Sequence, residues 1–240
     1  MEFISLHPFD VRIANTYVEA VTGRGEPDPA WAPWWSDDLR TGLDELATGN
    51  ELAANRLTVG LARAMAQAHP VFVQEGFGFT TWEARVDRGL GMLVRPPARI
   101  FVDAGVDRRL VDAMPIRLDL QGGMMGGAYV PDRLIGQLDE MIDQRLEPMA
   151  KRLKESEFDP FPMIALMREA VDYAKERNLG LMEALDVVTP DMRVIRAPEK
   201  KRMDPALRAR IEKAIQAEKK QGFFGRLFGK KRTDHDQPSS

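Results

Sequence analysis

The chain of 240 residues contains no cysteine. Disulfides, thiolate zinc sites, iron–sulfur clusters and cysteine nucleophiles are therefore excluded. Its apolar residues form no run approaching the roughly 18 to 20 residues that a helix needs to cross a bilayer. The first residues also lack a basic segment followed by an apolar one, so we expect no secretory signal. The location that we expect is the cytoplasm of a bacterium.

Histidine and serine are scarce, which limits the enzyme chemistry that the chain can perform. The three histidines are His7, His69 and His235. None stands in an H-x-x-x-H or E-x-x-H spacing, so a zinc or di-iron site has no support from the sequence. None of the five serines lies in a G-x-S-x-G motif, and Ser36 suits the cap of a helix. We therefore predict no metal site and no cofactor, and we assign no catalytic residue.

Charge is divided unevenly along the chain. Residues 188–240 carry 14 lysines and arginines against 7 aspartates and glutamates, whereas residues 1–187 carry 20 basic and 30 acidic residues. An acidic body argues against nucleic acid as the main partner. We predict three parts: an acidic globular α+β domain (1–187), a basic linker with an amphipathic helix (188–221), and a basic aromatic tail (222–240) that is disordered in water.

The order of apolar patterns indicates an α+β fold. Helical spacing over residues 10–22, with Gly23 as its stop, is followed by a helix that begins after Asn50 and ends before His69. The period then changes to that of strands, at 71–73, 77–86, 90–94, 99–102 and 116–121, and the pattern re-forms at 128–130 after a glycine-rich stretch. Because no long helical crossover interrupts residues 71–130, we predict a small, largely antiparallel sheet there, packed by the N-terminal and C-terminal helices.

Helical spacing returns at Pro131, which opens the longest amphipathic helix of the chain. Pro148 is expected to kink or break this helix near residues 144–147. One of its faces carries four carboxylates, which we interpret as a solvated face and not as a metal site. These carboxylates belong to Asp139, Glu140, Asp143 and Glu147.

The last part of the globular pattern contains shorter elements. Asp159 and Pro160 cap and open a helix that closes at Asn178. We predict a short helix over 181–187 and a linker with few apolar anchors over 189–203. A modest helix then begins at Asp204-Pro205 and runs to about Gln221, where Gly222 stops it.

A glycine-rich stretch is the first candidate for a binding site. The strand that ends at Gln121 is followed by Gly122, Gly123, Met124, Met125, Gly126 and Gly127. This stretch lacks the G-K-[ST] ending and does not match G-x-G-x-x-G, and its methionines stand where a phosphate site needs donors. A tight hairpin, a flap over a ligand or partner, and a phosphate loop stay open as interpretations.

Three charged residues are the candidate lining of a cleft beneath such a flap. Arg117 and Asp119 share one face of a predicted strand, where they line a cleft or face water. Asp103 follows another strand beside a glycine, which suits a catalytic acid or base and equally suits the cap of the next helix.

A proline-rich loop over 24–35 carries Trp31, Trp34 and Trp35. These tryptophans either grip a ligand or partner, or fasten the loop to the core through their large apolar rings. We favour the second interpretation, because burial of such rings dominates ordinary cores.

The C-terminal tail is the second candidate site. Six basic residues and no acidic residue lie between Lys219 and Arg232. In a helix the apolar side chains would fall within an arc of about 140°, opposite three glycines, so an anionic bilayer would fold the tail by burying its rings. The tail resembles the short basic-aromatic tails that hold many bacterial proteins at the inner membrane. The predicted membrane contacts are Phe223, Phe224, Arg226, Leu227, Phe228, Lys230, Lys231 and Arg232.

These patterns predict a non-catalytic interaction or adaptor protein. Its tail is expected to associate peripherally with an anionic membrane surface, on the inner face of the cell membrane, or to dock on an acidic protein partner. A tail that only solubilises the chain is the remaining interpretation. The alternative function is that of a small-molecule-binding protein or enzyme of unknown class that uses the Gly122–Gly127 flap.

Overall fold

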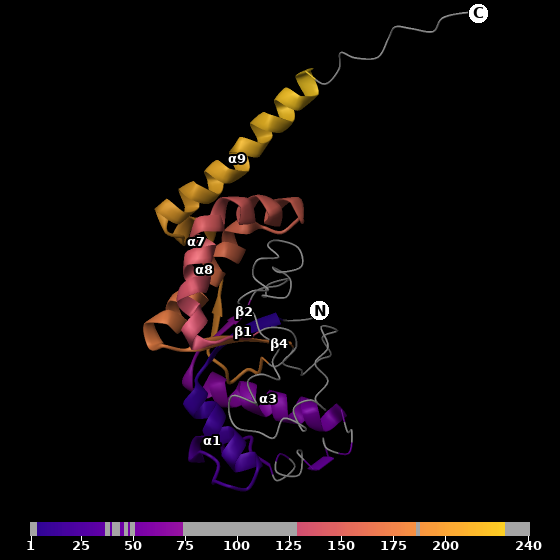
Figure 1. Ribbon diagram of the computed structural model, residues 1–240, viewed down its shortest axis with the longest axis vertical. Helices are drawn as coiled ribbons and strands as arrows, with labels where there is room; N and C mark the ends of the chain where they lie inside the picture. The colour runs from indigo at the N-terminus through magenta and orange to yellow at the C-terminus, as the bar shows by residue number, and fades with distance from the viewer. Residues whose placement is uncertain are drawn as a thin grey trace, which may run out of the picture.

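The computed structural model describes residues 4–36, 51–73, 129–185 and 188–228, together with residues 39, 44, 45 and 48. Helices and a five-stranded mixed sheet make the class α+β, as predicted (Figure 1). The α-helices with described bounds are α1 (Val11–Val21), α3 (Glu51–Ala68), α7 (Asp132–Glu155), α8 (Pro160–Arg177) and α9 (Pro205–Phe228). The strands are β1 (Ile4–Phe9), β2 (Val71–Val73), β3 (Tyr129–Val130), β4 (Gly180–Leu185) and β5 (Val194–Arg196).

The sheet has the strand order β3-β4-β1-β2-β5. Neighbouring strands pair antiparallel except β2 and β5, which are parallel. Of the strands in the described residues, β2 and β3 come from residues 71–130, where we predicted the sheet, and the other three come from outside that range. The remaining predicted strands between residues 77 and 128 lie outside the described residues.

The long pair at the centre of the sheet joins β1 to β4. Its register runs from Ile4 opposite Leu185 to Phe9 opposite Gly180. The prediction of a helix over 181–187 is therefore wrong. Residues 181–184 are good helix formers by propensity, but all four are buried, and pairing with β1 outweighs a preference of a few tenths of a kcal/mol per residue.

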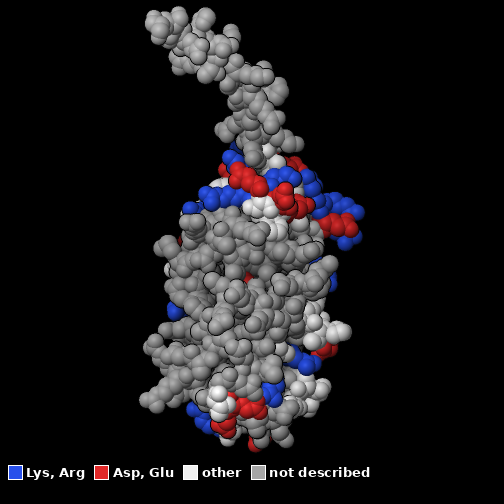
Figure 2. All heavy atoms as spheres, turned by 90° about the vertical axis from the view of Figure 1, so that its right-hand side faces the viewer, with Lys and Arg blue, Asp and Glu red and all other residues white. Residues whose placement is uncertain are grey.

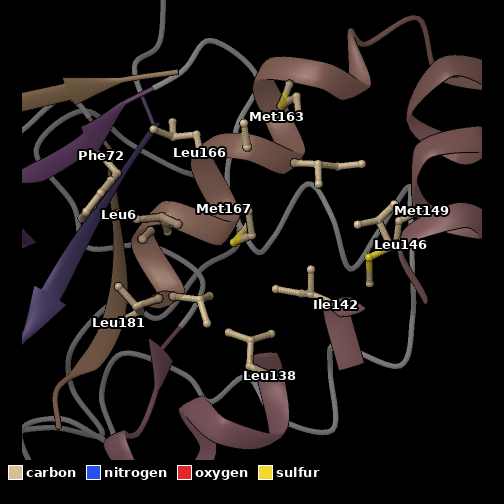
Figure 3. Packing of buried hydrophobic residues seen from close by; sticks show 14 of the residues in the cluster. Leu6, Phe72, Leu138, Ile142, Leu146, Met149, Met163, Leu166, Met167 and Leu181 are labelled. Atoms are coloured by element: carbon tan, nitrogen blue, oxygen red, sulfur yellow. The ribbon is translucent and has the colours of Figure 1, made fainter. Parts of the chain in front are cut away.

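Helices cover both faces of the sheet, with α1 and α3 on one face and α7 and α8 on the other (Figure 1). Alternate residues of β1 serve the two layers, because successive side chains of a strand point to opposite faces. Leu6 joins the cluster formed with α7, α8 and α9, whereas Phe9 joins the cluster formed with α1 and α3. Figure 3 shows Leu6 and Phe72 of the sheet meeting Leu166 and Met167 of α8.

The layer of α1 and α3 is held by a close approach between Tyr17 and Gly60. The Tyr17 hydroxyl donates a hydrogen bond of 2.7 Å to the Leu57 carbonyl. A Cβ atom at Gly60 would lie 2.4 Å from that hydroxyl oxygen, so only glycine fits here. The helix α1 begins at the cap Asp10 and is followed by Gly23 at φ 69°, which confirms the predicted helix and its stop.

The helix α7 bears on the prediction that Pro148 kinks or breaks it, of which only the break is contradicted. It continues through Pro148 to Glu155, so the proline does not break it. Buried Leu146 and Met149 on either side of Pro148 hold both parts against the core, which offsets the hydrogen bond that proline cannot donate.

The acidic residues of α7 are not a purely solvated face either. The Asp139 side chain is only 14% exposed and pairs with Lys175 at 2.6 Å and Arg168 at 3.0 Å, both on α8. Asp143 pairs with Arg210 on α9. These carboxylates therefore connect helices, which helical spacing alone does not reveal.

The segment over 189–203 contributes to the fold, so the prediction of a linker with few apolar anchors is wrong for it. It supplies β5, and the side chains of Met192 and Met203 are buried. The helix α9 begins at Pro205 as predicted but passes Gly222 and ends at Phe228. The division of the chain into three parts at residues 187 and 221 stays a prediction.

Candidate functional site

The predicted flap and cleft lie outside the described residues. This holds for the stretch Gly122–Gly127 and for Asp103, Arg117 and Asp119. Their assignment as a ligand or partner site stays a prediction. The described residues that come nearest to the stretch in the chain are those of β3, the edge strand that leads into α7.

The predicted membrane contacts from Phe223 to Phe228 belong to α9, although nothing is described of their side chains, and Lys230, Lys231 and Arg232 lie outside the described residues. The first half of α9 packs against the body through Leu207, Ile211 and Ile215. Figure 1 shows the rest of the helix pointing away from the sheet. The C-terminal aromatic residues are therefore carried on a helix whose other end is fixed.

Ion pairs support this attachment. Arg210 of α9 binds the Asp143 carboxylate at 2.6 Å and the Asp143 carbonyl at 2.7 Å. The Arg210 guanidinium holds the pKa of Asp143 below its usual range. Figure 2 shows acidic and basic side chains interleaved around the end of the body from which α9 leaves. This end of the described surface is therefore of mixed charge and not uniformly basic.

A second feature is a polar cluster at the edge of the sheet where β1 ends and β4 begins. Asp10 caps α1 and accepts hydrogen bonds from the Arg12 backbone N–H at 2.8 Å and from Nη2 of the Arg12 side chain at 2.7 Å. Burial alone would raise the pKa of Asp10, but the hydrogen bonds and charge of Arg12 outweigh it and lower that pKa. Asp10 is therefore a carboxylate whose charge is already matched.

His69, at the end of α3, lies beside Asp10. Its Nε2 atom is 3.9 Å from the Asp10 carboxylate, too far for a hydrogen bond, and its Nδ1 atom is 3.3 Å from the Tyr173 hydroxyl. Burial lowers the pKa of His69, and Arg177, Arg12 and Arg193 lower it further, whereas Asp10 opposes them. His69 is consequently neutral at neutral pH and places an uncharged ring between α3, α1 and α8.

A groove of about 330 Å³ opens next to this cluster. It is lined by Asp10, Arg12 and Asp132 together with the turn from Arg177 to Gly180 and neighbouring apolar residues. Gly180 has no room for a side chain, because a Cβ would lie 2.7 Å from the Val130 carbonyl oxygen. Neither His69 nor Tyr173 is among the residues that line the groove. Asp10 lines this groove, Tyr173 lines a separate groove of about 380 Å³ between α8 and residues 198–207, and His69 lines neither. The three groups therefore join their helices and do not share one cavity in which they could act together on a substrate.

The other described histidine is buried in the sheet. Ser5 donates to the Ala184 carbonyl at 3.3 Å, so its oxygen accepts from His7 Nε2 at 2.9 Å, and His7 carries its proton on Nε2. The His7 Nδ1 atom is buried without a hydrogen-bond partner. Burial lowers the pKa of His7 to about 3. A serine–histidine pair with no exposed surface serves the fold, because no substrate reaches it.

Sequence reasoning assigned no site to Asp10, His69 or Tyr173. The position of His69 before a proline was visible, but its neighbours come from elements far away in the chain. Among the described residues no group of three or more His, Asp or Glu could hold a metal ion. None of the described helices combines the length and the apolar character that crossing a bilayer requires. Comparison with protein-family models, curated protein sequences and solved structures found no match.

Proposed function

We propose that this protein is a non-catalytic interaction or adaptor protein that attaches peripherally to anionic membrane through the C-terminal end of α9. The observation that carries the proposal is the direction of α9. Its first half is held on the body, and its second half, which carries the aromatic residues of the tail and Arg226, points away from it (Figure 1).

The length of α9 fits this role. Among the residues of α9 whose side chains are described, Ile215 is the last that packs against the core, and 13 residues follow it before the helix ends at Phe228. At a rise of 1.5 Å per residue this segment extends for about 20 Å. The helix therefore presents its end beyond the acidic side chains of the body, which an anionic surface would repel.

The pattern of the tail supplies the attraction. Phe223, Phe224, Leu227 and Phe228 share one arc of the helix, and basic residues flank it. Each basic residue near an anionic surface contributes about 1 kcal/mol, and burial of the rings adds to this. We propose the inner face of the cell membrane of a bacterium as the location, because both signals fit its anionic lipids.

Cosedimentation with liposomes tests the proposal on the full chain. The wild type and two variants are each mixed with neutral vesicles and with vesicles that contain anionic phosphatidylglycerol, and the bound fractions are compared. One changes Phe223, Phe224, Leu227 and Phe228 to serine, and the other changes Arg226, Lys230, Lys231 and Arg232 to glutamine. We expect salt-sensitive binding of the wild type to anionic vesicles only, and reduced binding of both variants.

A matched control removes four basic residues from the described surface. It carries glutamine at Arg133, Arg193, Arg202 and Lys213, which are exposed. This variant should bind like the wild type, because its tail is unchanged. Equal loss in the control and in the tail charge variant would mean that net charge alone governs binding, and no binding by the wild type would refute the membrane proposal in favour of an acidic protein partner or no role.

The alternative of a small-molecule-binding protein or enzyme that uses the Gly122–Gly127 flap rests on residues outside the described ranges. It stays a prediction. The discriminating observation is a deep pocket bordered by Asp103, Arg117 and Asp119, and a flat wet face at these residues would remove it.

A further inference from the structure

A cavity lies between α3 and the tryptophan loop, which is the proline-rich loop over 24–35 that carries Trp31, Trp34 and Trp35. Figure 1 shows α3 on the side of the molecule away from α9. Its volume is about 250 Å³, slightly below the usual range for small-molecule sites. Its lining residues are Trp34, Ser36, Leu39, Arg56, Val59, Gly60 and Arg63. The surface that they present to the cavity is mainly apolar.

The loop that forms one wall is rigidly built. The backbone N–H groups of Trp34 and Trp35 both bond to the Trp31 carbonyl, at 3.0 and 2.9 Å. Trp31 itself is buried and stacks on Trp35 with ring centroids 5.9 Å apart. Trp31 thus fastens the loop to the core, as we predicted for these rings, and this leaves Trp34 at the cavity.

The floor of the cavity is shaped by the close packing at Gly60. Gly60 lines it, and Tyr17 lies directly behind, so no side chain can grow from Gly60 without meeting the Tyr17 hydroxyl. The missing side chain lets Tyr17 pack directly against the backbone of α3, which forms the floor at Gly60. The cavity therefore follows from the packing of α1 against α3.

The polar groups of the lining have one character in common. Arg56, Arg63 and the Trp34 indole are hydrogen-bond donors, Ser36 both donates and accepts, and none of the described lining residues is acidic. Three donor nitrogens here are buried without a hydrogen-bond partner: Trp34 Nε1, Arg56 Nε and Arg63 Nε. A ligand that fits this chemistry brings an acceptor or a negative charge.

The two arginines differ in how far their charge is matched. Arg56 forms an ion pair with Glu45. Within the described part of the chain, Arg63 faces the carboxylate of Asp191 at 4.0 Å, a distance too long for a hydrogen bond, and the Asp191 side chain is 59% exposed. The Arg63 guanidinium lies 5.5 Å from the centre of the Trp34 ring. Arg63 is thus the cation best placed to receive an anion beside an aromatic wall.

We propose that this cavity binds a small organic anion, whose apolar body lies against Trp34, Leu39 and Val59 and whose carboxylate pairs with Arg63. The small volume favours a single ring with a short acidic side chain. The site is independent of the proposed membrane attachment, because its described lining comes from residues 34–39 and from α3 and not from α9.

Three probes of nearly equal shape test the charge preference on the full chain: phenylacetate, 2-phenylethanol and phenethylamine. Binding is followed by the indole N–H resonance of Trp34, assigned with the variant Trp34→Phe. We expect phenylacetate to shift this resonance at millimolar concentrations and to bind about tenfold more tightly than phenethylamine, as a partly exposed ion pair allows. Equal affinity for the anion and the cation, or no shift with phenylacetate, would overturn the proposal.

Variants separate the pairing from the cavity itself. Arg63→Met should remove the preference for the anion while binding of 2-phenylethanol persists, whereas the control Arg152→Met, on the exposed surface of α7, should keep the preference. Val59→Phe fills the cavity and should abolish binding of all three probes, with the other indole resonances unchanged. Retained phenylacetate binding in folded Val59→Phe would place the ligand elsewhere and contradict the assignment.

Discussion

Burial of His7 makes the stability of the protein depend on pH in a calculable way. The folded protein lowers the pKa of His7 from 6.5 to about 3 because the ring is fully buried, with Nδ1 unpartnered. The neutral ring is therefore favoured by folding. Its contribution to the free energy of unfolding is fully present above pH 6.5 and is lost as the pH falls towards 3.

The magnitude follows from the slope of this linkage. One proton taken up only by the unfolded chain lowers the free energy of unfolding by about 1.4 kcal/mol per pH unit below the unfolded pKa. Between neutrality and pH 5 the loss due to His7 is thus about 2 kcal/mol, a sizeable part of the roughly 5 to 15 kcal/mol that stabilises a domain.

Urea denaturation at neutral pH and near pH 5 measures this loss. We compare the wild type with His7→Gln, whose amide N–H can still donate to Ser5 and which does not titrate. The variant should lose about 2 kcal/mol less than the wild type over this interval.

His235→Gln is the control and should behave as the wild type does. The carboxylates and His69 are the same in the wild type and in His7→Gln. Their effects therefore cancel when the stability losses of these two proteins are subtracted. Equal losses in the wild type and in His7→Gln would refute the burial argument.

Three further predictions concern packing, pairing and capping. Gly60→Ala should destabilise the wild type by several kcal/mol and the variant Tyr17→Phe by at least about 1 kcal/mol less. The reason is that removing the Tyr17 hydroxyl leaves the ring carbons, at 3.1 Å, as the nearest contacts of the new Cβ in place of the oxygen at 2.4 Å. Additive effects in a double-mutant cycle measured with urea would contradict this. Asp139→Asn should lower the free energy of unfolding by about 1 kcal/mol at low salt and by less at high salt, since the cationic partners of Asp139 are partly exposed. A loss that does not depend on salt would disprove the ionic origin. Asp159→Ala should lower the free energy of unfolding by about 1 kcal/mol, because it removes the cap of α8, whereas Asp159→Asn should retain most of the stability. Equal thermal stability of the wild type and both variants would count against the cap.

The helices of this fold were accessible from the sequence because one face of each is apolar at helical spacing. The helix α8 illustrates this, since its cap Asp159, its apolar face and its end at Asn178 were predicted and are confirmed. Asn178 ends the helix in a left-handed conformation, which the sequence analysis did not specify. The residues within such a helix and at its two ends are enough to predict where it begins, which face it buries and where it ends. Pro148 and Gly222 show the limit, because tertiary packing and helix continuation overrode signals that normally end a helix.

The central strands were not accessible in the same way. In β1, Ser5, His7 and Pro8 weaken any strand pattern, and Pro8 lies beyond the two residues that pair with β2. In β4 both faces are buried, so no alternation marks it. The polar cluster beside β1 shares this difficulty, because His69 and Tyr173 lie 104 residues apart in the chain and meet only in the folded protein.

The position of β1 at the centre of the sheet has a consequence for synthesis. Ser5 and Ala184 bond to each other across 179 residues, so β1 must wait for nearly the whole described chain before its longer pairing can form. At about 5 to 20 residues per second, a ribosome needs on the order of ten seconds or more to supply β4. During that interval the described part of the chain offers β1 the two-residue pairing with β2, which is too little to be stable alone. The nascent chain therefore exposes an unpaired, apolar strand, and we expect it to fold late and to depend on chaperones while it is being made.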